Sequence, residues 1–242
     1  MLTVTDKYRL FDATRIQIMT TAYTEKENSK MLLKKFNLNL YLVTDRRWLG
    51  GRTFETCIEA AIRGGVTLVQ LREKNLGSGD FFKMAQTVKA VTDRCNIPLI
   101  INDRLDIALA VDAAGVHLGL EDLPVVVARK LLGPDKIVGA SAATVDEAIL
   151  FQNQGADYLG VGAVFPTTTK LGNEAVSLDD LQTITAAVHI PVVAIGGINT
   201  ENAASVLATG VAGIAVVSAI MNQSDIEAAA MRLATIRKGA VA

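Results

Sequence analysis

Hydrogen-bond donors occupy every second position of the segment 70–74. Successive side chains of a strand point to opposite faces, so Gln70, Arg72 and Lys74 share one face. If that face lines a barrel, these donors reach its mouth, where Arg and Lys suit phosphate oxygens. The same pattern also fits a salt-bridged strand end, with Glu73 and nearby acids as the partners of the cations.

Carboxylates follow the next two apolar runs of the chain. Asp103 comes after Asn102 at the end of one run, and Glu121 and Asp122 come after the other. Loops after neighbouring strands meet, and Mg²⁺ takes one or two carboxylates together with water and substrate phosphates. Asp103 and Asp122 are therefore candidate Mg²⁺ ligands, although each of them alone fits the cap of a following helix.

Three later segments are suited to binding an anion. Residues 165–172 include Thr167, Thr169 and Lys170, which place hydroxyl groups and an ammonium in one loop. Two glycines, including Gly197, follow the seventh apolar run, and Val217-Ser218 follow the eighth. Loops after the seventh and eighth strands form the common phosphate site of α/β barrels. A polar loop and a tight turn are the alternative interpretations.

Short apolar runs alternate with longer runs of helical period from about residue 38 onward. Eight strands that are each followed by a helix indicate a (β/α)8 barrel, although an open, doubly wound sheet has similar local patterns. We predict an α/β protein with a single TIM barrel over residues 38–242 and a short N-terminal extension over residues 1–37. The predicted strands span residues 39–44, 68–72, 99–102, 115–118, 137–140, 158–161, 192–195 and 213–217. The predicted helices span residues 54–63, 79–93, 103–111, 123–132, 144–154, 178–188, 200–209 and 225–237.

Composition excludes several classes of partner. The 242 residues include 24 basic and 25 acidic side chains, so no bulk positive field exists to hold nucleic acid or an anionic membrane. The longest apolar stretch, residues 210–220, is far shorter than the roughly 18 residues that span a bilayer. The N-terminus lacks the pattern of a secretory signal, and two isolated cysteines fit a reducing compartment. We therefore expect a cytoplasmic protein whose partners are small molecules.

Six motifs, in order along the chain, identify a known family. Over about residues 39–237 the sequence resembles thiamine-phosphate synthases. The motifs are YLVTD at 41–45, QLREK at 70–74, INDR at 101–104, GVHLG at 115–119, VFPTTTK at 164–170 and AIGGI at 194–198.

The resemblance implies a transferase that joins a pyrimidine diphosphate to a thiazole phosphate with Mg²⁺ as cofactor. Pyrophosphate leaves first, and the thiazole nitrogen then attacks the pyrimidine cation. Catalysis is implied for Arg72, Lys74 and Lys170. The implied contacts are Gln70 near the pyrimidine; Arg72, Lys74 and Asn102 on the diphosphate; Asp103 and Asp122 on Mg²⁺; Ser141 and Lys170 on the leaving group; and Thr167, Thr169, Gly197, Val217 and Ser218 on the thiazole phosphate.

Two positions depart from the family pattern. Leu120 stands where the family usually has Gln, and Ala142 stands where it often has His. Two alternatives remain, a thiazole tautomerase on the same barrel and a non-catalytic sensor of thiamine precursors. Asp122, the threonines before Lys170 and the lack of a His after Ser141 favour the synthase. A homo-oligomer is compatible with the sequence.

Overall fold

A computed structural model describes residues 36–167 and 175–239. The predicted extension over residues 1–37 lies outside these ranges except for its last two residues. Thr169 and Lys170, both candidate site residues, also lie outside them.

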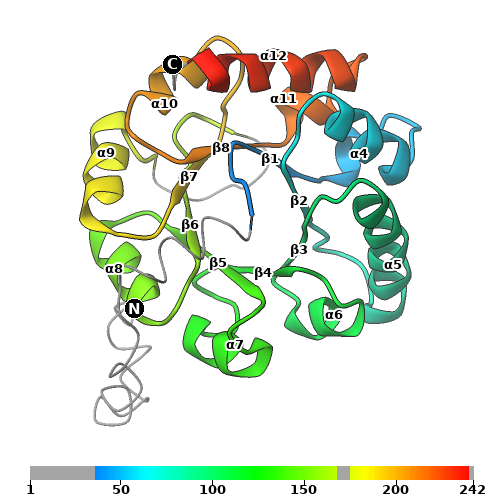
Figure 1. Ribbon diagram of the computed structural model, residues 1–242, viewed down its shortest axis with the longest axis horizontal. Helices are drawn as coiled ribbons and strands as arrows, with labels where there is room; N and C mark the ends of the chain where they lie inside the picture. Colours follow the sequence, from blue (N-terminus) through cyan, green and yellow to red (C-terminus); the bar gives the residue numbers. More distant parts are fainter. Residues whose placement is uncertain (1–35, 168–174, 240–242) are drawn as a thin grey trace. The chain divides into compact units, whose positions relative to one another are not determined.

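Eight parallel strands close into a barrel in the order of the sequence (Figure 1). The first strand pairs with the second on one side and with the eighth on the other, which closes the ring. The prediction of a single (β/α)8 barrel is confirmed. The strands are β1 (Leu40–Val43), β2 (Leu68–Leu71), β3 (Leu99–Asn102), β4 (Gly115–Leu118), β5 (Ile137–Ala142), β6 (Tyr158–Val161), β7 (Val192–Ile195) and β8 (Gly213–Val216).

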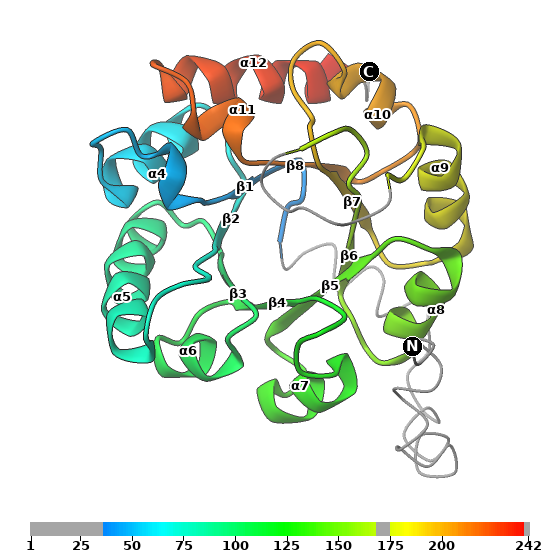
Figure 2. The same cartoon turned by 180° about the vertical axis from the view of Figure 1, so that it is seen from behind.

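Helices surround the strands on the outside of the barrel, as the views from both ends show (Figures 1 and 2). Each predicted helix is present, with ends shifted by up to three residues. Two short elements were not predicted, the 3-10 helix η1 (Arg46–Trp48) and the helix α11 (Ser218–Met221). No helix within the described ranges combines the length and the apolar character needed to cross a membrane. The other helices are α4 (Phe54–Arg63), α5 (Ser78–Arg94), α6 (Leu105–Ala110), α7 (Val125–Leu132), α8 (Val145–Asn153), α9 (Leu178–Ala187), α10 (Ala203–Leu207) and α12 (Ile226–Gly239).

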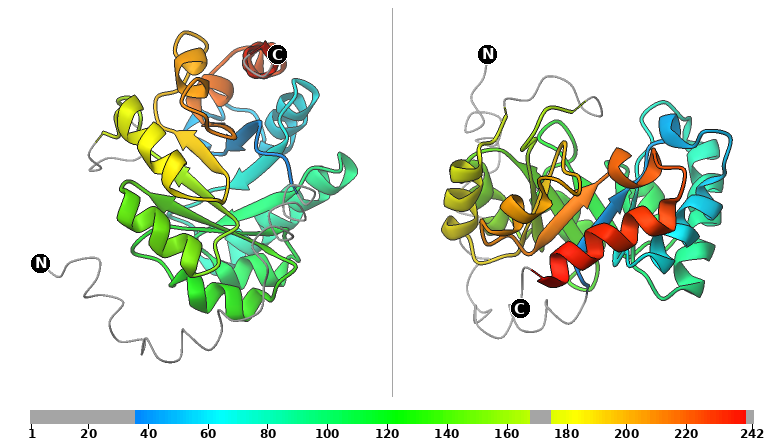
Figure 3. Two further views of the ribbon diagram at one scale, coloured as in Figure 1. Left: turned by 60° about the vertical axis from the view of Figure 1, so that its left-hand side comes forward. Right: turned by 90° about the horizontal axis from the view of Figure 1, so that it is seen from above.

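Local signals in the sequence start several of these helices. The hydroxyl of Thr144 accepts a hydrogen bond from the backbone of Glu147 at 3.2 Å, and that of Ser177 accepts one from Asp180 at 3.0 Å. Each bond satisfies an amide that the first turn of a helix leaves without a partner. The last helix, α12, lies along the outside of the barrel and packs against α4, which completes the ring of helices (Figure 3).

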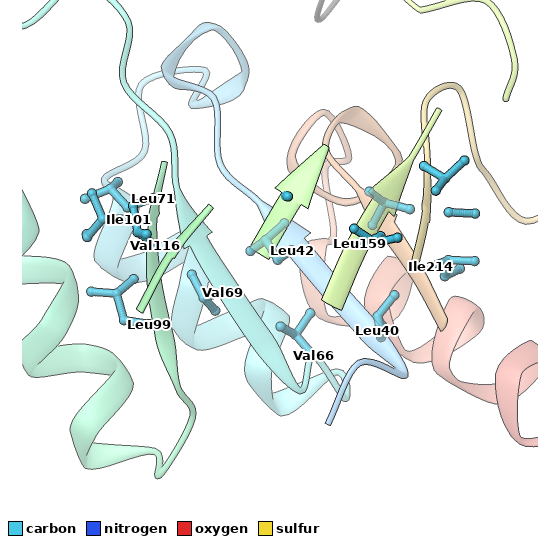
Figure 4. Packing of buried hydrophobic residues seen from close by; sticks show 14 of the residues in the cluster. Leu40, Leu42, Val66, Val69, Leu71, Leu99, Ile101, Val116, Leu159 and Ile214 are labelled. Carbon is cyan, nitrogen blue, oxygen red and sulfur yellow. The ribbon is translucent and has the colours of Figure 1, made fainter. Parts of the chain in front are cut away.

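Two apolar layers hold the barrel together. One lies between the strands and the helices, and Figure 4 shows part of it, including Leu42, Val69 and Ile101. The other fills the inside of the barrel and includes Ile100 and Val193. Because both faces of every strand are covered, the strands read as nearly continuous apolar runs.

Glycines on the inner face make room for rings inside the barrel. A Cβ atom at Gly139 would lie 2.2 Å from Cζ of Tyr158, and one at Gly160 would lie 3.1 Å from Cε1 of His117. Both rings are buried. The absence of a side chain at these strand positions is therefore what allows aromatic and imidazole rings to occupy the centre of the barrel.

The closure of the barrel gives a prediction about stability. A Cβ atom at Gly213 would lie 1.9 Å from the carbonyl oxygen of Leu38. We expect Gly213→Ala to lower the free energy of unfolding by about 3 kcal/mol, because the backbone just before β1 would have to move. Urea denaturation monitored by circular dichroism measures this change.

Gly79 provides the matched control for that variant. A Cβ atom there would meet nothing within 4 Å, and the residue lies in α5. We expect Gly79→Ala to stabilise the protein by about 0.5 kcal/mol, since alanine has fewer unfolded conformations to lose. Equal urea midpoints for the two variants would contradict the argument from close packing.

Candidate active site

A cavity of about 480 Å³ opens at the carboxyl ends of the strands. Loops after the strands form its rim, which is where the active sites of such barrels lie. Every candidate site residue that the structure describes lines this cavity. These residues are Gln70, Arg72, Lys74, Asn102, Asp103, Asp122, Ser141, Thr167, Gly197, Val217 and Ser218.

A buried carboxylate holds the cation that follows β2. Nη1 of Arg72 lies 3.5 Å from Oδ2 of Asp45, and Nη2 of Arg47 lies 2.6 Å from the same oxygen. Burial opposes ionisation of Asp45, but hydrogen bonds from the side chain and backbone of Arg47 outweigh it, so the pKa of this carboxyl lies below its ordinary value. Asp45 therefore stays charged and positions Arg72 at the cavity wall.

Glu73 points to a different partner from its neighbours in sequence. Its buried carboxylate accepts a hydrogen bond from Nε of Arg46 at 3.0 Å. Gln70, Arg72 and Lys74 line the cavity, whereas Glu73 does not. The alternation expected of a strand thus continues beyond the end of β2. The strand end is salt-bridged, as one interpretation of residues 70–74 expects, and its two cations line the cavity.

The two candidate metal ligands face each other across neighbouring loops. Burial and a hydrogen bond with Asp103 both raise the pKa of the Asp122 carboxyl. Nζ of Lys74 forms an ion pair with Asp103, and the backbone of Gly119 donates to Asp122 Oδ2 at 2.7 Å. Two carboxylates that face each other in this way are suited to hold one cation between them.

Neither of these carboxylates caps a helix. The N-cap of α6 is Arg104 and that of α7 is Pro124. The backbone of Asp103 has a φ of 61°, in the left-handed region that few side chains adopt. Its amide donates to the carbonyl oxygen of His117 at 2.8 Å, which fixes this conformation. The strained residue is the one whose carboxylate faces the cavity, as is common at functional sites.

Asn102 has a side-chain amide that lacks a partner. Its Nδ2 atom is buried and has no hydrogen-bond partner within residues 36–167 and 175–239. Leaving such a donor unpaired costs about 1–3 kcal/mol, so its position on the cavity wall suits an acceptor on a ligand.

Ser141 requires a correction to the predicted strand. The predicted strand ends at residue 140, but β5 continues to Ala142. Ser141 pairs with Gly160 and Ala142 with Val161 of β6, so the neighbouring strand extends the ladder by two residues. Oγ of Ser141 lies 2.9 Å from Nε2 of His117.

Four residues of the site were not singled out by sequence. Asp45 positions Arg72, while Tyr41, His117 and Tyr158 are polar rings inside the barrel. A usable signal was present, because His117 and Tyr158 are polar groups inside short apolar strands. Because the strands are apolar on both faces, their sequence pattern does not indicate which positions face inward.

The opposite side of the cavity has the geometry of a phosphate site. Gly197 has a φ of 64°, and a side chain there would meet Phe165 at 2.7 Å. Val217 is the N-cap of α11, a short additional helix directly after β8. In (β/α)8 barrels, a phosphate commonly binds at loops after strands seven and eight and at such a helix. The cavity also includes Leu120 and Ala142, which departed from the family pattern.

Comparisons with known proteins agree with this geometry. The thiamine monophosphate synthase family matches residues 40–220. Thiamine-phosphate synthase of Clostridium novyi is 55% identical over 201 residues, which cover 83% of this chain and 98% of that protein. The synthase of Ruminiclostridium cellulolyticum is 55% identical over 202 residues, covering 84% of this chain and 96% of that protein.

A solved structure extends the agreement to three dimensions. Thiamine phosphate pyrophosphorylase from Pyrococcus furiosus superposes with a TM-score of 0.79 at 41% identity, covering 86% of this chain and 100% of that chain. A pyrophosphorylase from Bacteroides thetaiotaomicron, at 18% identity and a TM-score of 0.58, shares the fold. The chain therefore belongs to the thiamine monophosphate synthase family and is a transferase of thiamine biosynthesis.

Proposed function

We propose that this chain joins 4-amino-2-methyl-5-(diphosphooxymethyl)pyrimidine to 4-methyl-5-(2-phosphooxyethyl)thiazole, giving thiamine phosphate and pyrophosphate. The observation that carries the proposal is the composition of one cavity wall. Donors and cations from the ends of β2 and β3 lie beside two carboxylates that share a hydrogen bond. A diphosphate with a divalent cation is the ligand that such a wall complements.

The residues present fit Mg²⁺ as the cation. Within the described ranges, no three or more His, Cys, Asp or Glu side chains cluster in a way that could hold a metal by themselves. Mg²⁺ requires no such cage, because it binds through one or two carboxylates plus water and substrate phosphates. Asp103 and Asp122 would hold it, and when bound it would neutralise charge on the departing diphosphate.

The protein groups would act mainly by binding and orienting the first substrate. Arg72 and Lys74 bind the diphosphate oxygens, and the unpaired Nδ2 of Asn102 donates to another oxygen. These fixed donors stabilise the charge that develops as the C–O bond breaks and pyrophosphate leaves. The amino group of the pyrimidine stabilises the resulting cation, with Gln70 beside the ring. Lys170 and Ser141 complete the contacts to the leaving group.

The second substrate would bind through its phosphate on the other side of the cavity. Backbone at Gly197, Val217 and Ser218, with the hydroxyls of Thr167 and Thr169, would hold the phosphate. This contact orients the thiazole so that its ring nitrogen faces the pyrimidine cation. The new C–N bond forms without a protein nucleophile, so catalysis depends on positioning and on stabilisation of the leaving group.

Release of pyrophosphate by the purified protein tests the proposal. We expect release only when both precursors and Mg²⁺ are supplied. Mg²⁺ is needed as the diphosphate departs, and the thiazole is needed to react with the pyrimidine cation that this departure leaves behind. Single-substrate reactions and a reaction with EDTA are the controls. Folded protein that binds the thiazole phosphate but releases no pyrophosphate would contradict the synthase and favour a tautomerase or a sensor.

A further inference from the structure

A continuous chain of hydrogen bonds crosses the inside of the barrel at the floor of the cavity. Nε2 of Gln70 donates to the Tyr41 hydroxyl at 2.8 Å, and this hydroxyl lies 2.8 Å from that of Tyr158. The Tyr158 hydroxyl lies 2.9 Å from Nδ1 of His117. Nε2 of His117 then lies 2.9 Å from Oγ of Ser141. The two ends of the chain are both proposed substrate contacts.

The number of hydrogens in this chain restricts its arrangement. Burial raises the pKa of both Tyr41 and Tyr158 well above the ordinary value for tyrosine, so each hydroxyl keeps one hydrogen. Each hydroxyl that donates in one link must therefore accept in the other. A neutral imidazole likewise has one donor and one acceptor nitrogen. A hydroxyl that accepted in both of its links would leave its own buried hydrogen without an acceptor in the chain, which is energetically costly. The arrangement that uses every hydrogen therefore follows from the direction of one link.

The first link sets that direction. Because the Gln70 amide donates to Tyr41, the Tyr41 hydrogen is directed to Tyr158. The Tyr158 hydrogen is then directed to Nδ1 of His117, which leaves the imidazole hydrogen on Nε2. That hydrogen is directed to Ser141, whose own hydrogen is consequently not used within the chain.

We propose that every hydrogen bond in this hydrogen-bond chain is donated in the direction from Gln70 to Ser141. This direction holds His117 as the Nε2–H tautomer and thereby makes the Ser141 hydroxyl a donor to the diphosphate. His117 and Tyr158 are then positioning residues that act through Ser141. The identity of the acceptor rests on the proposed function, whereas the direction of the chain does not.

The direction matters because phosphate oxygens in a diphosphate accept hydrogen bonds. In the reverse arrangement, the Ser141 hydrogen would be directed to His117, and only oxygen lone pairs would face the leaving group. The proposed arrangement instead presents a hydrogen to it. Gly139 and Gly160 leave the space in which the Tyr158 and His117 rings meet, so the two interior glycines make this link of the chain possible.

The tautomer of His117 can be observed directly in the ligand-free protein. The protein contains two histidines, His117 and the exposed His189. The signals that disappear from a ¹⁵N-histidine spectrum in the His189→Gln variant belong to His189, so those that remain belong to His117. At mildly alkaline pH we expect long-range ¹H–¹⁵N correlations in which Nε2 of His117 carries the hydrogen and Nδ1 carries none. A hydrogen on Nδ1, or on both nitrogens, would overturn the proposal.

The effect on Ser141 is measured with Mg²⁺ and inorganic pyrophosphate as the probe. Calorimetry on the wild type, Tyr158→Phe, Ser141→Ala and the double variant gives four dissociation constants. We expect each single variant to bind pyrophosphate about tenfold more weakly, which is the effect of one lost hydrogen bond to a charged group. The double variant should bind no more weakly than Ser141→Ala, because Tyr158 acts only through Ser141.

The two measurements separate the possible failures. Losses that multiply in the double variant would show that Tyr158 does not act through Ser141 and would overturn the proposal. If Tyr158→Phe does not fold, the wild-type spectrum still decides the direction of the chain. If the protein has the expected tautomer but fails to release pyrophosphate from the two precursors, the proposed function is contradicted and the proposed direction of the hydrogen bonds stands.

Discussion

Replacing Asp103 by Asn should lower kcat for pyrophosphate release by about two to three orders of magnitude, the scale seen when one preorganised electrostatic contact to a developing charge is lost. The amide has the same shape as the carboxylate but lacks its charge. It would weaken the proposed cation site that Asp103 forms with Asp122, and it would remove the ion pair with Lys74. Initial rates at a series of Mg²⁺ concentrations measure the effect.

Asp106→Asn is the matched control for this variant. Asp106 is exposed, lies three residues away and pairs with Arg104 at 2.5 Å. It does not line the cavity. We expect nearly normal kcat for Asp106→Asn. A wild-type kcat for Asp103→Asn with unchanged Mg²⁺ dependence would remove Asp103 from the proposed site, while equal losses in both variants would indicate a general effect of charge.

Asp157→Ala should lower the free energy of unfolding by about 3–5 kcal/mol, the usual cost of breaking a buried ion pair on one side. Asp157 forms an ion pair with Arg129, and its carboxylate accepts a hydrogen bond from the backbone of Val138 at 2.7 Å. The side chain of Asp157 is 10% exposed and that of Arg129 is 22% exposed. Removing the carboxylate leaves a buried charge and a buried amide without that partner. Urea denaturation measures the loss.

A surface ion pair gives the comparison for Asp157. Asp93 in α5 pairs with Lys89 at 2.6 Å, and its side chain is 58% exposed whereas that of Asp157 is 10% exposed. We expect Asp93→Ala to change stability by less than about 1 kcal/mol, because solvent screens the pair. A similar shift in the urea midpoint for both variants would mean that burial does not determine the contribution of Asp157.

The fold could be predicted from the sequence because each unit repeats the same local pattern. A strand buried on both faces needs an apolar run, and several of the helices that follow have their own start signal, as at Thr144. The short helix α11 could not be predicted, since four residues contain too little pattern to distinguish them from a loop. The extra residues of β5 depend on pairing with β6, which is a contact between distant segments.

The candidate site divides in the same way. Arg72, Lys74 and the two aspartates lie in the segments that follow strands, so the topology alone brings them to one end of the barrel. The partners that hold them were not predictable. The contact between Arg72 and Asp45 joins the ends of two strands, and the contact between His117 and Ser141 joins the neighbouring strands β4 and β5. These contacts depend on register and tilt, which the alternation of residue types does not specify.

Gly139 and Tyr158 occupy one shared volume in the middle of the barrel. A side chain can be added at Gly139 only if the ring at Tyr158 becomes smaller, and a smaller residue at Tyr158 alone leaves a void beside the glycine. We therefore expect the two positions to change together in evolution, because either change alone gives a less stable protein. A mutant library that varies the centre of the barrel should encode the two positions jointly.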